Sequence, residues 1–298
     1  MKEKTTIWTI LSCQSNVAEE DLCSWILFEH GTLGLEISNI DQQSLLIKAS
    51  FRPEDLSKEK ADDLRYHFKQ SGLEGVANTL KIDSLANQDW LSNWKKHFAP
   101  FHVGDSFLIC PPWSTKKLQR KESAEQKKII IDPGMAFGTG LHATTKFCLH
   151  AIERYLQGPN ILDVGTGSGI LSIASALLLP KAKIIAIDID ENAFENAEHN
   201  IALNGVETKI RLRQESLEAF DKANKTQFHT ILSNMTAEVI IDFLPNYNKM
   251  LASGGNLILA GIIEERLNLL ESALARYPFQ LIDKKMDKGW VGLVLTKP

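Results

Sequence analysis

Hydrophobic and polar residues follow two different spacings along the chain, and these spacings divide it into two predicted regions. In the first region, short segments rich in β-branched and aromatic residues alternate with segments whose apolar residues recur every three or four positions. The order strand, helix, strand, strand, helix, strand is typical of a ferredoxin-like α+β fold. The expected strands are 5–13, 33–40, 45–51 and 78–85, and the expected helices are 17–30 and 53–71.

From residue 129 onward, short apolar strands and amphipathic helices alternate, which predicts a parallel sheet with helices on both faces. Two final strands, 280–286 and 290–296, are joined by only three residues, so the sheet should end with an antiparallel strand. This arrangement is typical of AdoMet-dependent methyltransferases and unlike that of dehydrogenases. The other expected strands are 161–164, 184–188, 210–213, 229–232 and 257–260, and the helices are 170–179, 191–204, 236–251 and 264–277.

Residues 86–128 form a predicted linker between the two regions. Its expected elements are a helix over 88–98, a strand over 107–110 and an exposed basic loop over 116–128. The predicted fold class is α/β, a Rossmann-like class I methyltransferase sheet preceded by a small ferredoxin-like domain. The domains are expected at 1–85 and 129–298, on either side of this linker.

The composition is that of an ordinary globular protein, with 44% hydrophobic and 23% charged residues among 298, which excludes a disordered chain, a collagen and a coiled coil. The net charge of −4 gives no sign of a nucleic-acid-binding surface. Residues 1–85 hold 9 Lys or Arg against 14 Asp or Glu. This acidic region either is simply solvated or attracts a basic protein partner.

The sequence also bears on compartment and metals. The apolar stretch at 7–11 is too short for a signal peptide, and the longest apolar run, 170–179, is too short to span a membrane. We therefore expect a soluble, cytoplasmic protein without membrane contact. The four cysteines form no CxxC pair and the eight histidines show no metal-binding spacing, so no metal is expected.

A glycine-rich turn follows the first strand of the second region. In LDVGTGSGIL, Gly165, Gly167 and Gly169 follow the acidic Asp163, and glycines allow the backbone to turn tightly and approach a ligand. A dinucleotide site would need a further glycine where the chain has Ile170. The observed spacing instead favours AdoMet, with a plain tight turn as the alternative.

Asp188 ends the second strand, 23 residues beyond Gly165. A carboxylate at this place can accept hydrogen bonds from both ribose hydroxyls of a nucleoside. Asp190 is a competing candidate, but its position before Glu191 favours a helix cap. Because the carboxyl ends of neighbouring parallel strands share one edge of the sheet, the glycine turn and Asp188 should lie together.

Asn234 follows the fourth strand and is the candidate catalytic residue. Its amide oxygen and the neighbouring backbone carbonyl can accept hydrogen bonds from an amine, and neutral acceptors align the lone pair without stabilising the ammonium form. Alignment and proximity can supply most of the rate of methyl transfer. The alternative is that Asn234 only caps the helix that begins near Thr236.

The segment DPGMAFGTGLHATT, residues 132–145, is rich in glycine and lies directly before a helix. Thr144 and Thr145 could cap this helix and also touch a ligand. His142 could relay a proton, although a single histidine is more often structural. Phe137 lies between the glycines of the segment.

Together these residues resemble the PrmA family, the methyltransferases of ribosomal protein eleven of the large subunit. DPGMAFGTGLHATT is similar to the family's hallmark loop, LDVGTGSGIL and AIDID are similar to its cofactor motifs, and DWLSNWKKHFAPFHVGDSFLICPPW is similar to its linker. The resemblance implies S-adenosyl-L-methionine as cofactor and trimethylation of lysine side chains and the N-terminal amine of that ribosomal protein. It also implies that the first domain recognises the substrate protein and moves relative to the catalytic domain.

Carried over residue by residue, the resemblance implies cofactor contacts at Thr145, Gly165, Gly167, Asp188 and Asn234. It further implies that Phe137, His142 and Thr144 line the substrate entrance.

One departure concerns the fourth strand. The family usually has Ala-Asn followed by Ile-Leu, whereas this chain has Ser233, Asn234, Met235 and Thr236, so the number of methylations and the exact target stay open. Three alternatives remain: a methyltransferase of another protein's lysines, an AdoMet-binding module without activity, and an oxidoreductase.

Overall fold

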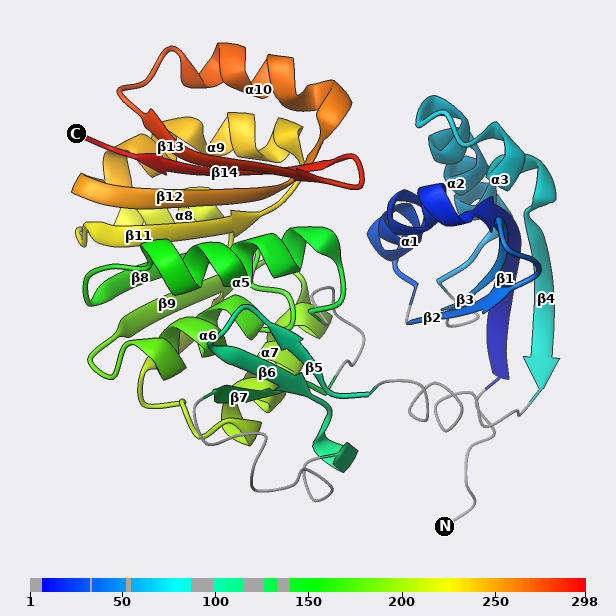
Figure 1. Cartoon of the computed structure of the whole chain (residues 1–298), viewed down its shortest axis with the longest axis horizontal. Helices are drawn as coiled ribbons and strands as arrows, with labels where there is room; N and C mark the ends of the chain where they lie inside the picture. Colours follow the sequence, from blue (N-terminus) through cyan, green and yellow to red (C-terminus); the bar gives the residue numbers. More distant parts are fainter. Residues whose placement is uncertain (1–6, 33, 52–54, 87–98, 115–125, 133–139) are drawn as a thin grey trace. The chain divides into compact units, whose positions relative to one another are not determined.

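The computed structural model describes residues 7–32, 34–51, 55–86, 99–114, 126–132 and 140–298 (Figure 1). The chain divides into two compact units, residues 1–98 and 99–298, called unit 1 and unit 2 below. Residues 99–128, assigned to the linker by the sequence analysis, are grouped with unit 2. The expected helix at 88–98 and residues 116–125 of the expected loop at 116–128 lie outside the described residues. The end of that loop was predicted wrongly, because Lys127 and Lys128 pair with a neighbouring strand and belong to β7 (Lys127–Ile130).

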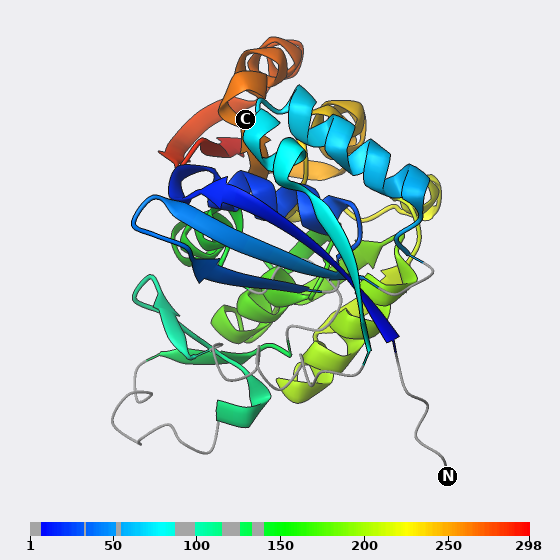
Figure 2. The same ribbon diagram turned by 90° about the vertical axis from the view of Figure 1, so that its right-hand side faces the viewer.

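Unit 1 contains an antiparallel sheet in the order β2-β3-β1-β4, with the four strands side by side (Figure 2). The first strand lies between the third and the last, as the predicted ferredoxin-like order requires. Apolar residues of α1, α2 and α3 and of the strands they cover form one core. The elements are β1 (Ile7–Asn16), α1 (Glu20–Glu29), β2 (Gly34–Asn39), β3 (Ser44–Phe51), α2 (Lys58–Gln70), α3 (Glu74–Thr79) and β4 (Lys81–Ala86).

The helix α3 was not expected, because the sequence pattern assigned a strand to 78–85. Val76 and Ala77 of α3 are buried in the core, and the side chain of Thr79 accepts a hydrogen bond from the Gln14 amide of β1 at 2.9 Å. Thr79 and Gln14 are far apart in the sequence, so the six residues of α3 become helical through tertiary packing. The strand begins only at Lys81.

Unit 2 is built on a sheet of seven strands in the order β10-β9-β8-β11-β12-β14-β13. Neighbouring strands are parallel except at β14, which pairs antiparallel with both β12 and β13. The antiparallel last strand is therefore confirmed, but it lies one place in from the edge. The strands are β8 (Asn160–Val164), β9 (Lys183–Asp188), β10 (Ile210–Gln214), β11 (Phe228–Asn234), β12 (Leu251–Ile263), β13 (Gln280–Asp287) and β14 (Trp290–Thr296).

The strands β13 and β14 differ in burial, and this explains their order. Most side chains of β14 are buried, whereas those of β13 are mostly exposed. An apolar strand gains more by lying inside the sheet, and a strand with charged residues protects an open edge.

Two groups of helices cover the two faces of the large sheet (Figure 1). The first group packs into one core and contains α5 (Ala143–Tyr155), α6 (Ile170–Leu178) and α7 (Glu191–Leu203). The second group packs into the other core and contains α8 (Leu217–Ala223), α9 (Ala237–Met250) and α10 (Leu267–Leu274). Among the helices of the described residues, none combines the length and the apolar character needed to cross a membrane.

The region before α5 adds a small third sheet to unit 2. Its strands are β5 (Phe101–Val103), β6 (Phe107–Cys110) and β7 (Lys127–Ile130), in the order β5-β6-β7. The predicted strand at 107–110 is confirmed. The buried residues Phe107 and Ile109 of β6 and Ile129 of β7 belong to the same apolar cluster as those of α5 and α6.

Candidate functional site

Three predicted motifs meet at the carboxyl ends of three neighbouring strands of the large sheet. In the register of the strands, Val164 of β8 pairs with Ile187 of β9 on one side and with Ser233 of β11 on the other. The glycine turn, Asp188 and Asn234 follow directly after these positions, at the carboxyl ends of the strands. The connection after β8 runs over one face and the connection after β11 over the other, so this edge is a topological switch point, where open α/β sheets bind ligands.

The glycine turn is held against β9 by its backbone. The amides of Gly165 and Thr166 donate to the carbonyl of Ile187 at 2.9 and 3.1 Å. Gly165, Gly167 and Gly169 have φ values of 68°, 55° and 80°, a conformation that favours glycine. A Cβ atom on Gly165 would also lie 3.0 Å from the Met235 side chain. The turn therefore exposes backbone rather than side chains at the start of α6.

Asp188 is joined to this turn through its carboxylate. Its Oδ2 accepts a hydrogen bond from the Gly167 amide at 2.9 Å, and its Oδ1 accepts one from the Asp190 amide at 3.1 Å. Burial raises the pKa of Asp188, while these amide bonds act in the opposite direction. Each carboxylate oxygen retains a lone pair for a further donor.

Two neighbours of Asp188 have separate roles. Asp190 caps α7 by accepting a hydrogen bond from the Asn192 amide at 3.0 Å, which confirms the predicted cap. Ile189 lies between the two carboxylates and is 74% exposed. Ile189 was not among the predicted site residues, although an apolar side chain between two acidic ones at the end of a strand is the available signal. Its exposed surface can cover one face of a flat ring.

Asp163 supports the turn from inside the sheet. It is 1% exposed, and its Oδ2 accepts hydrogen bonds from the hydroxyls of Thr166 at 2.7 Å and Ser172 at 2.6 Å. Burial raises the pKa of this carboxyl to about 6, the two hydroxyls oppose the rise, and Asp188 adds to it. The residue thus ties the glycine turn to the first turn of α6.

Asn234 has a buried amide oxygen. No hydrogen-bond partner for this Oδ1 is found within the described residues. The N-cap position of α9 is occupied by Thr236, and no side chain caps this helix with a hydrogen bond. The alternative that Asn234 caps the helix is therefore wrong. Burying an acceptor without a donor costs about 1–3 kcal/mol. An acceptor left in this state at a switch point is available for a ligand.

The neighbours of Asn234 that depart from the family pattern have contacts of their own. Ser233 is buried, and its hydroxyl accepts a hydrogen bond from the Tyr247 hydroxyl of α9 at 2.9 Å. Met235 lies against the glycine turn, and its amide donates to the Ala260 carbonyl at 3.0 Å. The serine is therefore occupied by α9, whereas the methionine borders the turn itself.

The segment before α5 is described from Gly140 onward, and Phe137 lies outside the described residues. His142, rather than either threonine, is the N-cap of α5: its Nδ1 accepts from the Thr144 amide. The ring of His142 meets the edge of Trp290 at 4.8 Å between centroids. Thr145 is 1% exposed, and its Oγ1 finds no partner in the part of the chain that the structure describes.

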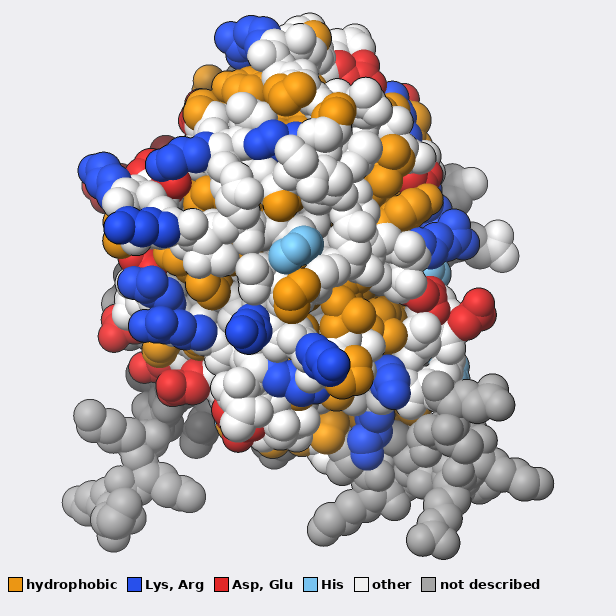
Figure 3. Space-filling model, turned by 90° about the vertical axis from the view of Figure 1, so that its left-hand side faces the viewer, with side chains coloured by type: hydrophobic (Ala, Val, Ile, Leu, Met, Phe, Trp, Pro, Cys, Tyr) orange, Lys and Arg blue, Asp and Glu red, His pale blue; other side chains and the backbone are white. Residues whose placement is uncertain are grey.

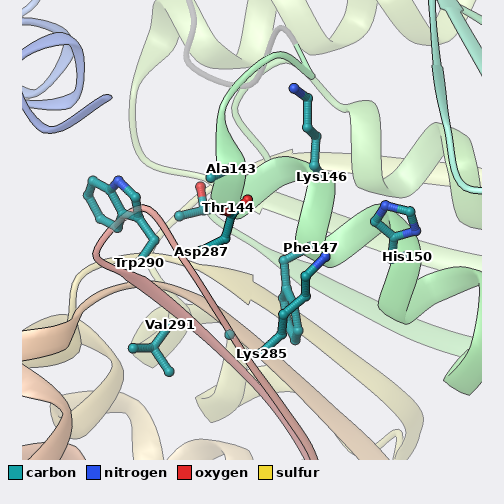
Figure 4. A pocket seen from close by; sticks show the side chains of 10 residues that line it. Ala143, Thr144, Lys146, Phe147, His150, Lys285, Asp287, Trp290 and Val291 are labelled. Atoms are coloured by element: carbon teal, nitrogen blue, oxygen red, sulfur yellow. The ribbon is translucent and has the colours of Figure 1, made fainter. Parts of the chain in front are cut away.

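A cavity of about 210 Å³ lies between α5 and the β13–β14 hairpin (Figure 4). Thr144 and Trp290 line it at one end, and Phe147, His150 and Lys285 at the other. The amine of Lys285 lies between Phe147 and His150, whereas Lys146 points away (Figure 4). Of the predicted entrance residues, the structure thus places Thr144 at a pocket and His142 beside it.

Comparisons with known proteins agree with this geometry. The sequence matches the family described as Ribosomal protein L11 methyltransferase (PrmA) over residues 7–298. Two Staphylococcus aureus proteins named ribosomal protein L11 methyltransferase, from strains bovine RF122 / ET3-1 and JH1, are 35% and 36% identical over 97% of this chain and 98% of their own. A crystal structure of a ribosomal protein L11 methylase from Lactobacillus delbrueckii subsp. bulgaricus has a TM-score of 0.60 and 35% identity, covering 67% of this chain and 99% of its own.

The residues at the sheet edge fit the cofactor of such an enzyme. A turn that exposes backbone can approach a ligand closely, and the Asp188 carboxylate can accept hydrogen bonds from ribose hydroxyls. The Asn234 Oδ1 has no donor among the described residues and can accept a hydrogen bond from a ligand. The chain belongs to the ribosomal protein L11 methyltransferase family and is an AdoMet-dependent methyltransferase.

Proposed function

We propose that this enzyme transfers methyl groups from AdoMet to lysine side chains and the N-terminal amine of ribosomal protein L11, with the trimethylated amine as end product. The observation that carries the chemistry is the buried Oδ1 of Asn234 at the carboxyl end of β11, for which the described residues offer no hydrogen-bond partner. The target rests on the family of the chain and on the names of its relatives.

In the proposed site, each side chain has one task. Asp188 holds the ribose, and the turn containing Gly165 and Gly167 lets the cofactor approach the backbone. The Thr145 hydroxyl, also buried without a partner in the described chain, contacts the cofactor. AdoMet, when bound, supplies the electrophilic methyl group.

Asn234 acts on the incoming amine. Its amide oxygen accepts a hydrogen bond from the neutral amine and aligns the nitrogen lone pair with the methyl group. A carboxylate in this position would instead stabilise the ammonium form, which cannot attack. Alignment of two bound reactants supplies most of the rate.

The substrate reaches this site beside the start of α5. Phe137, His142 and Thr144 line the entrance in our proposal. His142 caps α5 and packs against Trp290, so we assign it a positioning role rather than a proton relay.

We further propose a division of labour along the chain. Residues 1–85 recognise the ribosomal protein and move relative to the catalytic domain at 129–298, with 86–128 as the linker. The excess of acidic residues in the first domain suits a basic ribosomal protein.

The reaction takes place in the cytoplasm, on L11 that is free or in the assembling ribosome, and needs no direct nucleic-acid contact. On the face of unit 2 where its parallel strands begin, Lys and Arg side chains are interspersed with acidic and apolar ones (Figure 3). Such a mixed surface suits solvation better than binding to a phosphate backbone.

Radiolabelled AdoMet and the total ribosomal proteins of the source organism provide the test. We expect one labelled band, L11, with a mass increase in multiples of one methyl group on amines. The same assay with residues 1–85 removed should show AdoMet binding but no labelled L11. Normal labelling by this fragment would remove the recognition role.

Two other outcomes address the alternatives. Label on a different protein would retain the methyltransferase and discard the L11 target. No label on any protein, despite AdoMet binding by the full chain, would favour a binding module without activity.

A further inference from the structure

Three asparagines lie on one side of α7: Asn196 and Asn200 within the helix and Asn204 at its C-cap, with a spacing of four residues that brings them into line. All three bond to the backbone of residues 130–132, which lead from β7 into the glycine-rich segment before α5. Asn200 is fully buried, although it is a polar residue.

Asn200 differs from the other two because it also reaches the glycine turn. Its Oδ1 accepts a hydrogen bond from the Asp132 amide at 2.8 Å. Its Nδ2 donates to the carbonyl of Ser168, between Gly167 and Gly169, at 2.9 Å. One buried amide group thus joins two backbone segments that lie 36 residues apart in the sequence.

The other described end of the glycine-rich segment also lies against the start of α6. Gly140 is buried with a φ of 90°, and a Cβ atom there would lie 3.1 Å from the Ile170 side chain. Asp132 and Gly140 are therefore both fixed with respect to the turn at 165–169. The contact of Gly140 with Ile170 is only steric, whereas the hydrogen bonds of Asn200 are directional.

We propose that Asn200 is a positioning residue for cofactor binding, which couples the start of the glycine-rich segment to the glycine turn. It acts through Ser168, whose neighbour Gly167 donates to the carboxylate of Asp188. Removal of the amide takes one buried hydrogen bond from the Ser168 carbonyl and one from the Asp132 amide. The two segments then relax apart, because satisfying these groups with water requires space between them.

Asn204, at the C-cap of the same helix, is a matched control. Its Oδ1 accepts from the Ile130 amide at 2.8 Å, and its Nδ2 donates to the Ile130 carbonyl at 2.7 Å. It therefore makes the same kind of bonds to the same approaching strand. No hydrogen bond of Asn204 reaches residues 165–169 in the described chain, so its loss tests stability without the coupling.

The experiment compares Asn200→Ala and Asn204→Ala in the full-length enzyme. Calorimetry measures Kd for AdoMet and for S-adenosylhomocysteine, steady-state assays give KM and kcat, and thermal unfolding gives Tm. Asn200→Ala should raise Kd and the KM for AdoMet about tenfold, with a smaller change in kcat. Both variants should lower Tm to a similar extent, because each loses buried hydrogen bonds to the backbone. Asn204→Ala should leave Kd within about twofold of the wild type.

Hydrogen exchange of the wild-type enzyme provides a measurement that needs no variant. Bound S-adenosylhomocysteine should slow exchange at the Asp132 amide, because the ligand stabilises the turn to which Asn200 ties this residue. An Asp132 amide that does not respond to the ligand would contradict the coupling. Equal AdoMet affinity in the two variants, or unchanged affinity in Asn200→Ala, would also overturn the proposal.

Discussion

Buried polar groups are treated differently in the two units of this enzyme. In unit 1 most such groups pair with one another: the half-buried rings of His30 and His67 meet at 3.0 Å between Nε2 and Nδ1, and the sulfurs of Cys13 and Cys23 lie 3.9 Å apart. The Ser50 hydroxyl is the exception, because it is buried without a partner among the described residues. At the carboxyl edge of the large sheet in unit 2, the Asn234 Oδ1 and its counterparts stay without partners in the described chain. These counterparts are Thr145 Oγ1 and Asp163 Oδ1.

The difference separates groups that serve folding from groups that serve binding. A pair within the protein repays the desolvation of both members. An unpartnered acceptor only lowers stability until a ligand donates to it, so such groups beside the predicted cofactor motifs are candidates for binding. Three experiments test this comparison.

Asn234→Ala should have the largest effect on turnover. We expect kcat to fall about 100-fold, because the incoming amine loses its alignment, while Tm stays equal or rises since the Asn234 Oδ1 has no hydrogen bond to lose in the described chain. The matched control is Asn256→Ala, because the Asn256 side chain is also buried but donates to the Tyr155 carbonyl at 2.8 Å. This control should lose stability and retain turnover. Full activity of Asn234→Ala would end its catalytic assignment.

Asp188→Ala should act on affinity. Loss of hydrogen bonds to a charged acceptor costs about 1.5–3 kcal/mol, which corresponds to a Kd for AdoMet raised about 10- to 150-fold. Asp190→Ala, which removes only the cap of α7, should lower stability by about 1 kcal/mol and leave this Kd unchanged. Calorimetric titration of both variants provides the measurement. If they bind alike, the ribose contact is assigned to the wrong residue.

The smallest effects are gradual and have opposite signs in the two units. Burial raises the pKa of Asp163 in the folded state to about 6, so unit 2 binds a proton more tightly when folded. Its free energy of unfolding should fall as pH rises from about 4 to 6, by at most about 1.4 kcal/mol per pH unit. Burial lowers the pKa values of His30 and His67, so unit 1 should lose stability as pH falls below about 6.5.

Peptide-resolved hydrogen exchange at increasing urea follows the two units separately. Asp163→Asn should reduce the dependence in unit 2, to which the raised pKa of Asp188 also contributes, and leave that of unit 1 unchanged. The same slope in both units of the wild type would contradict the assignment of these groups.

Much of the site could be predicted because its signals are local. The glycine spacing, Asp188 at the end of its strand and the Asp190 cap each depend on a few consecutive residues, and all three occupy the expected places. The helix α8 was missed, although Ser216 gives the usual capping signal by accepting from the Ala219 amide. The short helix α3 had no local signal of comparable strength.

The sequence by itself determined the alternation of elements, the class of the fold, the family and the residue types at the carboxyl ends of the strands. These follow from periodicity and from backbone rules that act over a few residues. Only the tertiary structure decided that β14 lies between β12 and β13, that His142 caps α5, and that the Asn234 Oδ1 is buried without capping α9. It also decided that Asn200 joins two distant segments. Such outcomes depend on which surfaces come together in the fold, because burial and hydrogen-bond satisfaction are settled between residues that are far apart in the chain.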